Sequence, residues 1–301
     1  MGTFYNEARK NSMKTWFLLS FFSLFLIIVG WALSFAFGDM LILYIAVGFA
    51  VISSFISYWK SDKIVLAMSN AKEASVKDYP EIHNIVENLA ISEGLPKPKV
   101  YIINEDQPNA FATGRNPEHG VVAVTKGLID RLEKSEIEAV IAHELAHIKN
   151  RDVLVSTIAV VFAGAISIAS RIFLRSLIFG RGRSSNNSGG KGNALMLIIG
   201  IVVALLAPIF ALMIKLAISR KREYLADSSA ILNTRYPDGL ASALKKISSH
   251  PNELKAANDA TANLYIANPL RGKSKKSFLS NLFSTHPPVE ERIKKIREID
   301  I

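Results

Sequence analysis

The chain has 301 residues, of which 50% are hydrophobic, and its 36 Lys and Arg against 26 Asp and Glu give a formal net charge of +10. It contains no cysteine, which excludes disulfides and thiolate ligands, so any metal must be held by nitrogen and oxygen atoms. The basic residues lie beside apolar stretches rather than interleaved with aromatic residues, which argues against nucleic-acid binding and favours contact with anionic lipid headgroups.

The first 60 residues predict a transmembrane hairpin. Residues 15–38 and 40–59 carry no charge and are each long enough to cross a bilayer as a helix. The first stretch is too long for a signal peptide and a second follows at once, so we expect an uncleaved anchor. Basic residues flank both outer ends of the hairpin, whereas Asp39 alone is charged in its turn, which predicts that the water-soluble part faces the cytoplasm.

The segment 61–151 begins a predicted water-soluble region. A helix opens at Pro80 and closes at Gly94, with apolar residues on one face between them. Three short extended runs follow, with turn residues at 116–120 between the last two, and they predict a small, mostly antiparallel sheet. The three runs are 99–103, 110–113 and 121–125.

Residues 143–147 read His-Glu-Leu-Ala-His within a stretch of good helix formers. Histidines four apart on a helix lie on one face, one turn apart, so His143 and His147 can reach the same metal ion. Glu144 projects beside them, where it can accept a proton from a water on that metal. On the pattern alone, two surface histidines of an amphipathic helix explain the motif about as well as a zinc site does.

Two further apolar segments, 153–170 and 194–214, predict a second hairpin. Its connecting segment carries five basic residues and no acidic residue, so full crossing would place a basic loop outside, against the positive-inside rule. A shallow or re-entrant hairpin would remove this conflict. Full crossing is the favoured interpretation and gives about four transmembrane helices, with the re-entrant course as the alternative.

A catalytic zinc site needs a third protein ligand and an open position. Glu223 and Asp227 lie four apart on one predicted helical face. The histidine pair lies shortly before the second hairpin and Glu223 shortly after it, so the hairpin would bring both to a similar depth beside the membrane. As alternatives, Glu223 could lie on a solvated helix face, and Asp227 could cap the helix or pair with a neighbouring arginine.

Four motifs in order resemble those of the HtpX family of membrane zinc metalloproteases, which is more distantly similar to the CAAX prenyl proteases. The motifs are NAFATG at 109–114, HELAH at 143–147, SRKREYLAD at 219–227 and STHPP at 284–288. The resemblance covers nearly the whole chain and implies one zinc ion per chain. The residues with implied roles are His143, His147 and Glu223 as ligands and Glu144 as catalytic base.

The same resemblance implies roles for residues near the C-terminus. His286 and Arg292 are expected near the developing oxyanion, although His286 alone could be a turn histidine before two prolines. Asp227, one turn after Glu223, suits a carboxylate that holds the other nitrogen of a ligand histidine.

The run Asn109, Ala110, Phe111 and Ala112 predicts a strand that binds substrate. An exposed edge strand can pair backbone to backbone with an extended peptide, and this gives affinity without strict sequence choice. The small side chains of Ala110 and Ala112 permit a close approach. The resemblance implies the same assignment.

The expected fold is that of an α+β membrane protein with about four transmembrane helices and a mainly helical, zincin-like metallopeptidase domain. Its parts are an N-terminal transmembrane hairpin at 1–60, a second hairpin at 152–214, and the two portions of the metallopeptidase domain at 61–151 and 215–301.

The expected function is that of a zinc endopeptidase in the plasma (inner) membrane of a prokaryote. Its partners would be the lipid bilayer and exposed or misfolded membrane proteins, which it would cleave at the cytoplasmic face in protein quality control. One alternative is a narrow-specificity CAAX-type protease, although four spans are few for the large intramembrane chamber that this would need. Another is a catalytically idle, zinc-stabilised scaffold or holdase, against which the presence of Glu144 argues.

Overall fold

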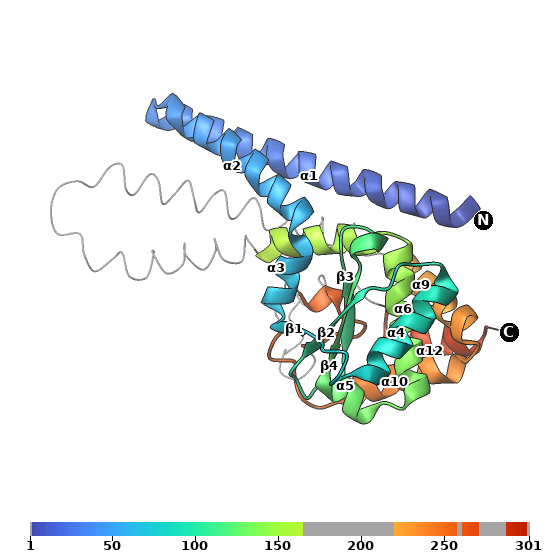
Figure 1. Cartoon of the computed structure of the whole chain (residues 1–301). Helices are drawn as coiled ribbons and strands as arrows, with labels where there is room; N and C mark the ends of the chain where they lie inside the picture. Colours follow the sequence, from blue (N-terminus) through green and yellow to red (C-terminus); the bar gives the residue numbers. More distant parts are fainter. Residues whose placement is uncertain (1, 165–219, 258–260, 271–286, 300–301) are drawn as a thin grey trace.

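The computed structural model describes residues 2–164, 220–257, 261–270 and 287–299 (Figure 1). A long hairpin of two N-terminal helices extends from a domain in which helices surround a small sheet. The predicted hairpin segment 194–214, residues 165–170 of the predicted segment 153–170, and His286 lie outside the described residues.

The N-terminal hairpin consists of α1 (Gly2–Phe37) and α2 (Met40–Trp59). Both contain a stretch long and apolar enough to cross a membrane, with a mean hydropathy of 2.3 in each. Asp39 begins α2 by accepting a hydrogen bond from the amide of Leu41 at 2.9 Å. Most large apolar side chains of α2 are exposed, as expected for a helix that faces lipid. Two of the four expected spans therefore correspond to helices of suitable length.

The second predicted hairpin is described only at its start, as a helix over Asp152–Gly164. This helix packs against α1, and the rings of Phe22 and Phe162 stack there with their centroids 4.0 Å apart. The helix therefore connects the end of the histidine motif directly to the N-terminal hairpin.

The sheet has four strands in the order β1-β2-β4-β3. The predicted runs all form strands with the predicted bounds, and a short 3-10 helix lies in the predicted turn before β4. The β1–β2 and β3–β4 pairs are antiparallel, but β2 and β4 are parallel, so the sheet is mixed. The four strands are β1 (Ala71–Glu73), β2 (Lys99–Ile103), β3 (Ala110–Thr113) and β4 (Val121–Thr125).

One face of the sheet packs against α4 and α6, and α9 and α10 pack on α6 in turn. α12 packs on both α9 and α10 and completes this core. The opposite face packs against α3 and the ring of Tyr265, and α5 follows β4. The helices are α3 (Ser61–Met68), α4 (Pro80–Glu93), α5 (Lys126–Arg131), α6 (Lys134–Lys149), α9 (Arg220–Thr234), α10 (Pro237–Ser249) and α12 (Val289–Arg297).

The helix α6, which carries the histidine motif, has a well-defined start and a close contact with the sheet. At its start, Glu133 and Glu136 form a capping box, in which the Glu136 carboxylate accepts a hydrogen bond from the Glu133 amide at 2.8 Å. Near its end, Ile148 packs so closely on Gly120 that a Cβ at the glycine would lie 3.1 Å from the isoleucine side chain. The motif therefore lies on a rigid helix held against the sheet.

Candidate metal centre

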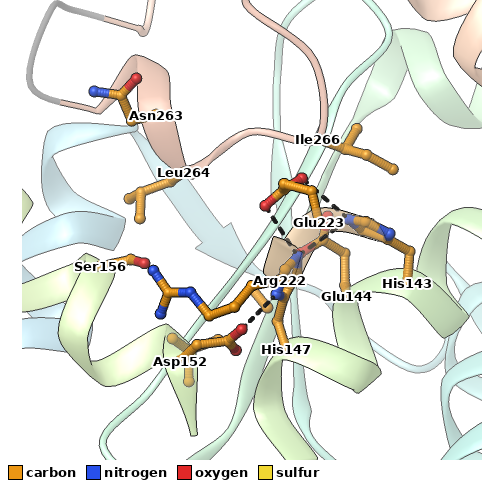
Figure 2. A pocket seen from close by; sticks show the side chains of 12 residues that line it. His143, Glu144, His147, Asp152, Ser156, Arg222, Glu223, Asn263, Leu264 and Ile266 are labelled. Carbon is orange, nitrogen blue, oxygen red and sulfur yellow. Dashed lines mark hydrogen bonds and ion pairs between the residues drawn. The ribbon is translucent and has the colours of Figure 1, made fainter. Parts of the chain in front are cut away.

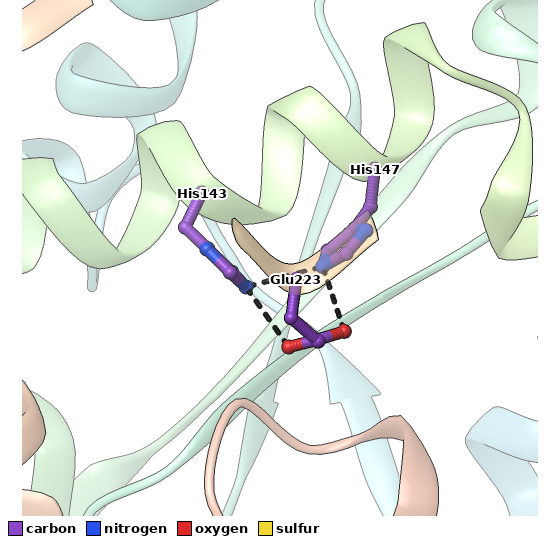
Figure 3. Close-up of side chains that lie close together, drawn as sticks. All are labelled: His143, His147 and Glu223. Carbon is purple, nitrogen blue, oxygen red and sulfur yellow. Dashed lines mark hydrogen bonds and ion pairs between the residues drawn. The ribbon is translucent and has the colours of Figure 1, made fainter. Parts of the chain in front are cut away.

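His143 and His147, one turn apart on α6, converge with Glu223 of α9 (Figure 3). The two histidine Nε2 atoms lie 3.1 Å apart. The Glu223 carboxylate oxygens lie 3.8 Å from Nε2 of His143 and 3.7 Å from Nε2 of His147. Donor atoms on one tetrahedral zinc ion lie about 3.3 Å apart, because each bond to zinc is about 2.0 to 2.2 Å long. Two imidazole nitrogens and a carboxylate at these separations fit one such ion.

A carboxylate lies behind each of these histidines. Oδ1 of Asp227 lies 3.0 Å from Nδ1 of His143, and Oδ2 of Asp152 lies 3.2 Å from Nδ1 of His147. A carboxylate at Nδ1 favours the tautomer whose Nε2 is free to bind a metal. Asp227 therefore lies where the sequence analysis expected it, against a histidine of the metal group.

The sequence analysis missed Asp152. This residue lies beyond the end of α6, after a turn in which Arg151 adopts a left-handed conformation with φ of 56°. The turn brings the carboxylate back to the histidine five positions earlier, and the motif spacing alone does not predict it. The available signal was an acidic residue shortly after the second histidine, in the run KNRD.

Glu144 is 2% exposed and lies in the pocket beside the metal group (Figure 2). Burial raises the pKa of its carboxyl to about 7, and the nearby charge of Glu223 acts in the same direction. The backbone amide of Ala112 hydrogen-bonds to this carboxylate. A buried carboxylate with a pKa near neutrality suits a group that accepts and returns a proton.

The two histidines differ in their affinity for a proton. Burial disfavours the charged form of both, and in His143 it prevails and lowers the pKa. In His147 the charges of Asp152 and Glu223 outweigh burial and raise the pKa to about 9. The surroundings of His147 therefore attract positive charge, and a metal ion bound there would compete with a proton.

Arg292 lies beside the metal group without lining the pocket, and its Nη1 is 3.8 Å from Oε2 of Glu223. Its expected role at the oxyanion stays a prediction. The Arg292 side chain is 1% exposed, and its Nε and Nη2 donate to the two carboxylate oxygens of Asp227 at 2.9 and 2.6 Å. Its Nη1 donates to the carbonyl of Ile266 at 2.8 Å. A buried guanidinium needs an acidic partner, and the two oxygens of a carboxylate match two of its parallel N–H donors. Burial disfavours the charged form of Asp227, but Arg292 outweighs it and lowers the pKa of this carboxyl.

The expected substrate strand is β3, which forms one edge of the sheet, but its residues are buried rather than exposed. The amide of Ile266 donates to the carbonyl of Ala110 at 2.9 Å, and the side chain of Asn109 donates to the next carbonyl along that segment. The expectation of an exposed edge is therefore wrong at the start of the strand, because another part of the chain pairs with it. Of the four predicted residues, Ala112 lines the pocket.

The site defines the class of the protein: a metalloprotease whose metal-binding helix is followed directly by a helix that packs on an apolar N-terminal hairpin. The family model described as Peptidase family M48 matches residues 77–300, a range that contains all the residues of the metal group. The chain belongs to peptidase family M48.

Known relatives match nearly the full length of the chain. A protease HtpX homolog from Dictyoglomus thermophilum is 44% identical over 299 residues, covering 98% of this chain and 94% of that protein. A protease HtpX homolog from Syntrophobacter fumaroxidans is 48% identical over 291 residues, covering 96% and 99%. The crystal structure of S. mikatae Ste24p matches 98% of this chain and 67% of its own, with a TM-score of 0.48 and 18% identity. The two homologues and the family match confirm the resemblance to HtpX proteases.

Proposed function

We propose that this protein is a multi-pass membrane endopeptidase that holds one zinc ion per chain and cleaves exposed or misfolded segments of membrane proteins at the cytoplasmic face. The observation that carries the proposal is the metal group of His143, His147 and Glu223. Its donor atoms all lie within 4.8 Å of one another, beside the buried carboxylate of Glu144.

The residues of the site have complementary roles in this proposal. Zinc, when bound, supplies a Lewis acid that polarises the substrate carbonyl and acidifies a water molecule. Glu144 accepts the proton of that water and passes it to the leaving amine. Its carboxylate is oriented for this by the amide of Ala112. Asp152 and Asp227 keep the ligand histidines in one tautomer.

The placement of the pocket supports a membrane-protein substrate. Asp152, Val153 and Ser156 line the pocket, and they belong to the helix that packs against the candidate span α1. Ala112 lines the same pocket from the edge strand, where an extended peptide can lie along the backbone. Segments that are unfolded close to the bilayer therefore have the shortest path to the metal group.

Replacing Glu144 tests the catalytic assignment. In detergent-purified protein, Glu144→Gln should retain about one zinc per chain but cleave casein about 100-fold to 10,000-fold more slowly, because the proton acceptor is lost. Glu138→Gln, on the same helix, is the matched control and should cleave at the normal rate. Unchanged proteolysis by Glu144→Gln would refute the assignment, and a wild-type protein that binds zinc without cleaving would indicate a scaffold.

The absence of cysteine allows a direct test of orientation. Single cysteines introduced as Lys72→Cys in β1 and Met40→Cys at the start of α2 replace exposed residues. In intact cells, a membrane-impermeant maleimide should label Met40→Cys, whereas Lys72→Cys should react only after the membrane is opened. Labelling of Lys72→Cys from outside would contradict the cytoplasmic placement of the domain.

A further inference from the structure

Arg222 is a buried cation in the pocket to which the mechanism gives no task. It lies on α9 next to Glu223 and lines the pocket, with 8% of its surface exposed. Two of its nitrogens, Nε and Nη1, are buried and have no hydrogen-bond partner within the described part of the chain. An unpaired guanidinium away from water is costly, so this side chain is suited to bind an acidic group that enters the pocket.

The acid on the same side of the pocket does not pair with Arg222. Asp152 directs Oδ2 to Nδ1 of His147 at 3.2 Å and forms no ion pair with Arg222 among the described residues. In Figure 2 the guanidinium extends along the pocket wall toward Ser156, away from His143. The charged end of Arg222 therefore faces the space beside the metal group rather than the metal group itself.

The neighbours of Arg222 indicate the chemistry of its partner. The hydroxyl of Ser156 offers a second hydrogen-bond donor, while Val153 and Leu264 provide apolar walls in the same pocket. A guanidinium with a hydroxyl beside it can donate hydrogen bonds to both oxygens of a carboxylate. Apolar lining residues can contact the short aliphatic chain that carries such a carboxylate. An aspartate or glutamate side chain combines these two parts.

We propose that Arg222 forms a substrate subsite that selects a peptide segment with an acidic side chain near the bond to be cleaved. The proposal rests on the proposed function, since it assumes that a peptide occupies this pocket. Arg222 would thereby add sequence preference to a site in which pairing along the edge strand is indifferent to sequence.

The test uses the zinc-loaded full-length protein in detergent and quenched fluorescent peptides of one neutral sequence. A single glutamate is moved through successive positions, and each peptide has a matched glutamine version. At one position the wild type should show a kcat/KM about 10-fold to 100-fold higher for glutamate, the range expected for hydrogen bonds to a charged group. Arg222→Met should cleave both versions at the glutamine rate, whereas Arg220→Met, an exposed residue of the same helix, should keep the preference.

A charge reversal and a conservative change complete the design. Arg222→Glu should prefer lysine at the same position, and Arg222→Lys should retain part of the glutamate preference even if the methionine variant folds poorly. Equal losses for all peptides, together with loss of zinc, would overturn the subsite and assign Arg222 to the support of Asp152. A glutamate preference that persists in Arg222→Met would overturn it as well. Failure of the wild type to cleave any peptide or casein would instead count against the proposed function.

Discussion

At the level of single residues, the two histidines of the metal group differ in how firmly the carboxylates at their Nδ1 atoms are held. Asp227 binds the guanidinium of Arg292 through both oxygens. Asp152 has only its Oδ2 engaged, on His147, while its buried Oδ1 has no hydrogen-bond partner within the described part of the chain. Supporting groups of this kind tune both the orientation and the basicity of a metal ligand. The orientation of Asp152 at Nδ1 of His147 therefore depends on a single described hydrogen-bond contact.

The first prediction concerns Asp152. Asp152→Asn should lower zinc affinity about 10-fold to 100-fold, because an amide no longer offers a negative charge to Nδ1 of His147. Competition between the purified protein and a fluorescent chelator would measure this change. Asp78→Asn, an exposed substitution far along the chain, is the control and should bind zinc normally. Zinc affinity that is equal in Asp152→Asn and the wild type would remove Asp152 from the site.

The spacing of the residues predicted the metal group but not all of the side chains that hold its histidines in place. Two histidines four apart and an acid pair four apart each imply a shared helical face, and the structure brings His143, His147 and Glu223 together as expected. The role of Asp152 depends on a left-handed turn, and that of Arg292 depends on tertiary packing of α12. Neither leaves a periodic signal in the sequence.

At the level of secondary-structure elements, α10 holds the metal-binding helix through one buried carboxylate. Glu136 of α6 accepts hydrogen bonds from Ser242 at 2.6 Å and from Lys246 at 2.7 Å. Burial alone would raise the pKa of Glu136, but these hydrogen bonds outweigh burial, so its pKa is lowered. The charged form of Glu136 therefore stabilises the folded protein.

The second prediction is a pH-dependent loss of stability in Glu136→Gln. Because the folded pKa is lowered, the stabilisation is fully present above the ordinary glutamate pKa of about 4.3 and disappears as the pH falls through the folded value. At pH 7 the variant should unfold at a lower temperature than the wild type. Its free energy of unfolding should be smaller by about 1.5 to 3 kcal/mol, the contribution of hydrogen bonds to a charged group. Glutamine keeps the capping box, so this measurement isolates the charge. A deficit that stays constant while the pH falls well below the ordinary glutamate pKa and through the folded value would contradict this explanation.

The strands show which parts of an element the sequence can predict. Runs of extended-favouring residues between turn signals gave the bounds of β2, β3 and β4 correctly. The three-residue strand β1 was missed because it is too short to show alternation. The parallel pairing of β2 with β4 was also missed, since every residue of β4 is buried and its side chains do not alternate between solvent and core.

At the level of the whole molecule, polar and cation–π contacts join the N-terminal hairpin to the catalytic domain, in addition to the packing of α1 on the helix Asp152–Gly164. The side chain of Asn11 on α1 donates to the carbonyl of Asn150, the residue that ends α6, at 3.0 Å. The guanidinium of Arg115 lies over the ring of Trp59 at the end of α2, 4.6 Å from its centroid. The first contact lies two residues before Asp152, so the hairpin also supports the turn that positions this carboxylate.

The last prediction follows from that contact. Asn11→Leu leaves the buried carbonyl of Asn150 without its donor, a loss of about 1 to 3 kcal/mol. The loosened turn should hold Asp152 less firmly, so zinc affinity should fall, though by less than in Asp152→Asn. Thermal unfolding and chelator competition in detergent measure the two effects, with the exposed substitution Ser20→Ala on the same helix as control. If Asn11→Leu lowers the unfolding temperature while zinc affinity stays unchanged, the hairpin stabilises the fold without positioning the metal group.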